Sequence, residues 1–240
     1  PLAARQVYRG ALERGIRALQ TTAAATGDRQ AALGAAAMEK WAAYLEDDAA
    51  FAARNDDQLG KAQSEHGSTA GDLAERRALA ASFCELAERF LPEAADDLSM
   101  AGTAFQGAHD TVYEIWETVA RTGPFDPDPA KFRQPARRRA MAGLVRRLVE
   151  FDRRGLAFLE RALAAVDGRA PGAPIAPDPV LDGTVALAKA QLPAPAQVRW
   201  APENIAMPNA LGMLAAFLGE SVHGLEGYDL WMGLSGAAFG

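Results

Sequence analysis

The chain has 240 residues, among them 54 alanines but only 10 valines and 4 isoleucines. Alanine is the best helix former, whereas half-buried strands are built from β-branched residues, so this composition excludes a β-rich fold. The formal net charge of −6, with 23% charged residues, argues against general disorder and against a nucleic-acid-binding class. The single cysteine, Cys84, excludes an internal disulfide, and its helical setting predicts a small buried hydrophobe.

The first third of the chain predicts two amphipathic helices and a loop. The first helix carries Tyr8, Leu12, Ile16 and Leu19 at spacings of three and four residues. A break at 26–28 follows, and Asp28 is a candidate N-cap for a second helix that fades at 55–57. Residues 60–72 are rich in glycine and serine, which predicts a loop.

Three further helices are indicated in the middle of the chain. One begins after Asp72 and stops near Pro92, and the next runs from about Leu98 to Val119. The prolines between 123 and 135 predict a connection in which no helix continues. The clearest helix follows, with regularly spaced apolar residues from Met141 to Leu163 and an end at Gly168.

The number of predicted helices and the short connections between them indicate an all-α protein, an antiparallel bundle of five to seven helices. We expect residues 1–169 to form the bundle. Residues 170–208 hold 8 of the 14 prolines and predict an extended wrap packed on it. A C-terminal helix within 209–240 is expected to belong to the same domain.

Two histidines are candidate ligands or proton carriers. His109 follows Phe105 by four residues and is predicted to point toward the core, beside Tyr113 and Trp116. Glu220 and His223 are three residues apart, which places a carboxylate and an imidazole on one helix face. A pocket or a mononuclear metal site around His109, Glu220 and His223 is therefore one hypothesis, and a histidine satisfied within the core is the other.

The helix of Glu220 and His223 also has a stripe of small residues, in which glycine or alanine stands at 212, 216, 219 and 227. Close helix packing explains such a stripe, and a haem held by His109 or His223 would also fit it. No attachment motif supports haem, and no cofactor is assigned. Asp48 interrupts the apolar stripe of its helix, so it is expected either to pair with an arginine across the bundle or to act as a general base.

Charge is segregated along the chain. Residues 131–161 contain ten basic and three acidic residues, a net +7, which leaves −13 for the rest. Neutralisation by the acidic regions 46–57 and 85–97 is one interpretation. Binding of an anionic partner is the other. The arginines that we expect to carry such binding are Arg137, Arg138, Arg146 and Arg147.

Searches for phosphate-binding, dinucleotide-binding, nucleophile-elbow and zinc-protease motifs find none in the sequence. The leading hypothesis is a non-catalytic helical interaction or assembly protein, whose partner is another copy or another protein. The alternative is a helical enzyme or a ligand-, metal- or haem-binding protein, and a small-molecule partner stays open. No apolar run is long enough to span a membrane and no signal-peptide pattern is seen, so we expect a cytoplasmic protein.

Overall fold

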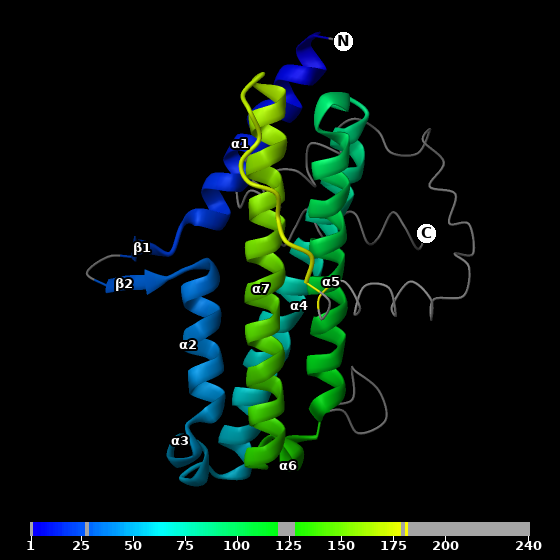
Figure 1. The fold of residues 1–240 in the computed structure, drawn as a ribbon. Helices are drawn as coiled ribbons and strands as arrows, with labels where there is room; N and C mark the ends of the chain where they lie inside the picture. The colour runs from blue at the N-terminus through cyan, green and yellow to red at the C-terminus, as the bar shows by residue number, and fades with distance from the viewer. Residues whose placement is uncertain (1, 27–28, 120–127, 179–180, 182–240) are drawn as a thin grey trace, which may run out of the picture.

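The computed structural model describes residues 2–26, 29–119, 128–178 and 181 (Figure 1). Asp28, most of the expected wrap and the whole expected C-terminal helix, with Glu220 and His223, lie outside the described residues. The described chain forms an all-α fold with one small hairpin. Its elements are α1 (Leu2–Gln20), β1 (Ala23–Thr26), β2 (Arg29–Ala32), α2 (Gly34–Glu46), α3 (Asp48–Ala52), α4 (Asp56–Glu88), η1 (Pro92–Ala94), α5 (Ala95–Val119), α6 (Pro129–Phe132) and α7 (Pro135–Val166).

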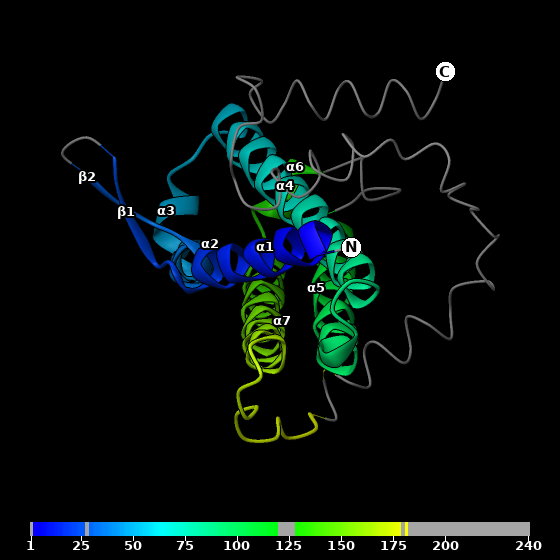
Figure 2. The same ribbon diagram turned by 90° about the horizontal axis from the view of Figure 1, so that it is seen from above.

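Three long helices, α4, α5 and α7, make up the centre of the bundle, and each of α4 and α7 packs against α5 (Figure 1). Helix α2 lies along the first half of α7, and α1 crosses the second half of α7 at an angle (Figure 2). Consecutive long helices run in opposite directions, as an antiparallel bundle requires. The predicted fold class is therefore confirmed.

The core has two parts. The lower core joins α2, α3, α6, the first halves of α4 and α7, and the second half of α5. The upper core joins α1, the second halves of α4 and α7, and the first half of α5. Where α5 and α7 meet between the two parts, Phe105 lies over Gly155 and Phe151 lies over Gly107. The two glycines therefore let both aromatic rings reach the backbone of the opposite helix.

The prediction of a loop at 60–72 is wrong, because these residues continue α4 without a break. A capping box at Asn55 and Gln58 starts the helix, with both reciprocal hydrogen bonds present. Apolar contacts then outweigh the low helix propensity of the glycines, since Leu59, Ala62 and Ala70 are all buried. Packing, and not local preference, sets the structure here.

The structure adds detail to two other connections. The break after α1 is a β-hairpin in which Ala23 pairs with Ala32, and it projects from the bundle (Figure 2). Gly34 then begins α2 with φ +53°, where an added Cβ would lie 3.0 Å from the carbonyl oxygen of Thr21. The proline-rich connection contains the short helix α6, because Asp128 caps it and Pro129 suits a first helical turn.

The first residues after α7 extend along the bundle. Arg161 donates to the carbonyl oxygens of Gly172 and Ala173 at 2.9 and 3.1 Å, and Ile175 packs against the upper core. Leu181 is buried in the lower core. The remainder of 170–208 lies outside the described residues, so the wrap as a whole stays a prediction.

Candidate functional site

His109 lies at the edge of the core and not within it. Its side chain is 22% exposed, and its Nδ1 lies 2.9 Å from Oδ1 of Asp110. The buried stripe of α5 passes through Phe105, Ala108 and Val112, and His109 lies at the edge of this stripe. In the tautomer with a proton on Nδ1, this atom donates to Asp110, Gln106 donates to the same carboxylate oxygen at 2.9 Å, and the His109 Nε2 atom keeps its lone pair.

The three α5 side chains proposed from the sequence do lie together. The ring of Tyr113 is 5.1 Å from that of His109 and also 5.1 Å from that of Trp116, centroid to centroid. Tyr113 is 38% exposed, while Trp116 packs partly against the lower core. These three residues form a continuous row along one side of α5, which we call the α5 aromatic row, and Tyr113 is its exposed member.

No contact between the α5 aromatic row and Glu220 or His223 is described, because those two residues lie outside the described ranges. Within the described ranges, no group of three or more histidine, cysteine or acidic side chains is placed to hold a metal ion. The pocket hypothesis thus stays a prediction. Cys84 is fully buried, and burial raises the pKa of its thiol.

Asp48 forms the ion pair that was one of its two expected roles. Its Oδ1 accepts from Arg138 at 2.5 Å, and its Oδ2 accepts from Arg139. Arg138 is 1% exposed and also donates to the carbonyl oxygens of Leu45, Phe132 and Arg133 at 3.1, 3.2 and 2.6 Å. This guanidinium therefore ties together the ends of α2 and α6 and the start of α7.

The arginines of α7 are largely paired with neighbouring helices. Arg146 makes two hydrogen bonds to Glu46, at 2.7 and 2.6 Å, and their strength lowers the pKa of that carboxyl. Arg147 lies 3.1 Å from Glu114, and Arg137 donates to the carbonyl oxygen of Thr118 at 2.9 Å. All four arginines proposed to bind an anion thus already donate to this chain, and an anion would have to compete with those bonds.

One buried ion pair was not foreseen. Arg77 of α4 donates to both carboxylate oxygens of Asp152 in α7, at 2.6 and 2.5 Å. The two side chains are only 11% and 8% exposed. A signal for it exists in the sequence, because Asp152 falls between Leu148 and Leu159 at helical spacing, the same kind of intrusion that singled out Asp48.

A second missed feature is His66, which lies in the segment predicted to be a loop. Trp41 of α2 donates its indole N–H to Nδ1 of His66 at 3.1 Å, so the neutral ring carries its proton on Nε2. Nε2 is buried and has no hydrogen-bond partner within the described structure. Burial lowers the pKa of His66 to about 4.

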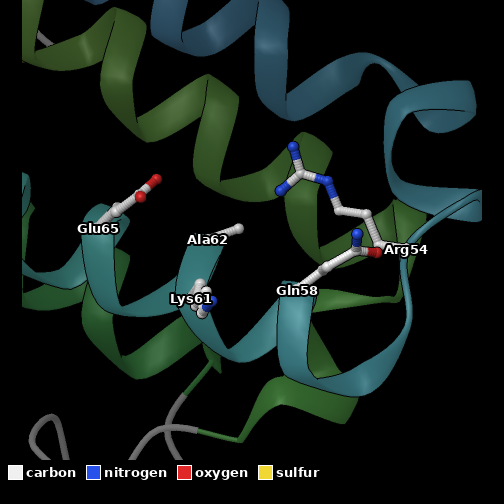
Figure 3. A pocket seen from close by; sticks show the side chains of 5 residues that line it. All are labelled: Arg54, Gln58, Lys61, Ala62 and Glu65. Carbon is white, nitrogen blue, oxygen red and sulfur yellow. The ribbon is translucent and has the colours of Figure 1, made fainter.

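An open hollow lies beside the first turns of α4 (Figure 3). Its volume is about 270 Å³. Arg54 and Gln58 stand at one end, Glu65 stands at the other, and Ala62 lies between them with Lys61 beside it (Figure 3). None of these residues was singled out in the sequence.

Comparisons with family models, with curated proteins and with solved structures gave no match for this chain. None of the helices in the described ranges combines the length and hydropathy needed to cross a bilayer.

Proposed function

We propose that this protein is a non-catalytic helical interaction protein that binds another protein surface through the α5 aromatic row. The observation that carries the proposal is the α5 aromatic row, in which Tyr113 is 38% exposed and lies between two other rings, tilted against His109 and edge-on to Trp116. Aromatic side chains dominate the centres of protein interfaces because they bury a large area at low entropic cost. We further propose the cytoplasm as its location.

The paired charges support this reading over an enzyme. Asp48, the candidate general base, is held by two arginines, and the buried Asp152 is neutralised by Arg77. Both carboxylates therefore have a structural task that explains their positions. The alternative function is an enzyme or a ligand-, metal- or haem-binding protein, and it requires that Glu220 and His223 lie next to His109.

Light scattering of the full chain over a range of concentrations tests the proposal in its self-association form. The expected result is a mass that rises above 25.4 kDa with concentration and returns to the monomer value in Tyr113→Ser. Phe90→Ser, which changes an equally exposed aromatic residue outside α5, is the control. A monomer at every concentration would contradict self-association. The partner would then be a protein of different sequence, which photo-crosslinking from position 113 tests.

A further inference from the structure

The hollow at the start of α4 brings unused hydrogen-bond donors to one place. Arg54 donates a hydrogen bond only from its Nε–H, to the carbonyl oxygen of Ala50 at 3.1 Å. Its two terminal nitrogens have no acceptor within the described residues. The arginines of α7 discussed above differ in this respect, because their terminal nitrogens already donate to other groups.

The Arg54 side chain is held in place by its neighbours. Its guanidinium carbon lies 5.4 Å from the ring centroid of Tyr44 and 5.2 Å from that of Phe51. Such cation–π contacts, together with the bond to Ala50, fix the planar group before any ligand arrives. A donor held in advance loses less entropy when it binds an acceptor.

Two further donors border the same space. The side-chain oxygen of Gln58 accepts from the Asn55 backbone in the capping box, so its amide N–H₂ group remains for another acceptor. Lys61 has no ion pair among the described residues, although Glu65 stands one helical turn later. Arg54, Lys61 and Gln58 all line the hollow, so a guanidinium, an ammonium and an amide border it.

The charges select the kind of acceptor. Arg54 and Lys61 contribute two positive charges and Glu65 contributes one negative charge, so the lining is singly positive. We propose that this hollow binds a singly charged carboxylate, with Arg54 as the bidentate donor and Lys61 as the second cation. Glu65 disfavours more highly charged anions such as phosphate.

Nuclear magnetic resonance titration of the ¹⁵N-labelled full chain tests this site. Sodium acetate is expected to cause saturable shifts at the Arg54 Nε–H and at the amides of Gln58, Lys61 and Ala62, while sodium chloride at equal ionic strength does not. Phosphate is expected to bind no more tightly than acetate. A capped peptide with one glutamate identifies the source of the bound carboxylate. If the peptide binds more tightly than acetate, the carboxylate belongs to a protein partner. If it binds more weakly than acetate, the ligand is a free acid.

Variants separate a specific site from general charge effects. Arg54→Gln and, independently, Lys61→Gln should weaken acetate binding roughly tenfold, as expected for loss of a charge-assisted hydrogen bond. Arg76→Gln removes the same charge from an exposed position later in α4 and should leave the affinity unchanged. Shifts that follow ionic strength alone, equal loss in all three variants, or phosphate binding at least tenfold tighter would overturn the proposal.

Discussion

Trp41 and His66 join α2 to α4 through a hydrogen bond of 3.1 Å that only a neutral imidazole can accept. Protonation of Nδ1 would turn this acceptor into a donor facing another donor. The contact is thus built for a histidine that stays neutral, in agreement with its pKa of about 4.

This contact predicts acid-sensitive stability. The unfolded chain binds a proton at His66 near pH 6.5, whereas the folded chain does so only near pH 4, so stability is lost as the pH falls through that interval. Between pH 7.5 and pH 5 the loss attributable to His66 is about 2 kcal/mol. Urea unfolding at the two pH values measures this loss. In His66→Gln the loss of unfolding free energy between them should be smaller by about 2 kcal/mol than in the unchanged protein. An unchanged pH dependence in that variant would contradict the assignment.

The glycines of the α5–α7 contact make a second prediction. A Cβ at position 155 would lie 2.7 Å from Cε1 of Phe105, so Gly155→Ala should destabilise the fold by about 1–3 kcal/mol despite its better helix propensity. Gly143→Ala, in the same helix with nothing within 4 Å of the added atom, should instead stabilise it by roughly 0.5–1 kcal/mol. Thermal and chemical unfolding measure both, and the same sign in the two variants would refute this packing.

The Arg77–Asp152 pair yields a third prediction, because both charges are nearly buried. Removing one partner in Arg77→Met leaves Asp152 without its counter-ion, at an expected cost of about 3–5 kcal/mol in the free energy of unfolding. The double variant Arg77→Met/Asp152→Leu should recover most of that loss, since it leaves no unpaired charge. A double variant as unstable as the single one would show that the pair does not act as a unit.

A fourth prediction compares two neighbouring arginines that share Asp48. Arg138→Lys should cost about 2–4 kcal/mol, because one ammonium cannot reach three carbonyl oxygens and a carboxylate at once. Arg139 is 56% exposed in its side chain, so Arg139→Lys should be close to neutral. Denaturant unfolding of both variants under one condition decides the matter, and similar losses would contradict the role given to Arg138.

Hydrophobic spacing predicts the long helices well, since Met141 to Leu163 marks α7 almost to its ends. It fails where tertiary contacts decide. Residues 60–72 looked like a loop because their glycines and serines disfavour helix, but buried neighbours hold them in α4. The hairpin at Ala23 and Ala32 has no sequence signal either, because alanine is a poor strand former.

Some site residues could be predicted from the sequence, and others could not. Asp48 was found because a charge interrupts an apolar stripe, and its arginine partners confirm one of its two expected roles. His66 was missed because a histidine in an expected loop raises no question about burial. Arg54 and Lys61 come together only through the fold, since nothing in their spacing shows that their donors are unused.

The α5 aromatic row carries the proposed function, and photo-crosslinking from it tests the claim most directly. The full chain is expressed in the cells it comes from, with benzoylphenylalanine in place of Tyr113. Irradiation should crosslink it to one defined protein or to a second copy of the chain. The same group at position 153, an exposed site on α7, should give no such product. The expected product disappears when Trp116→Ala is added. Equal products from both positions, or none from position 113, would contradict an interaction surface on α5.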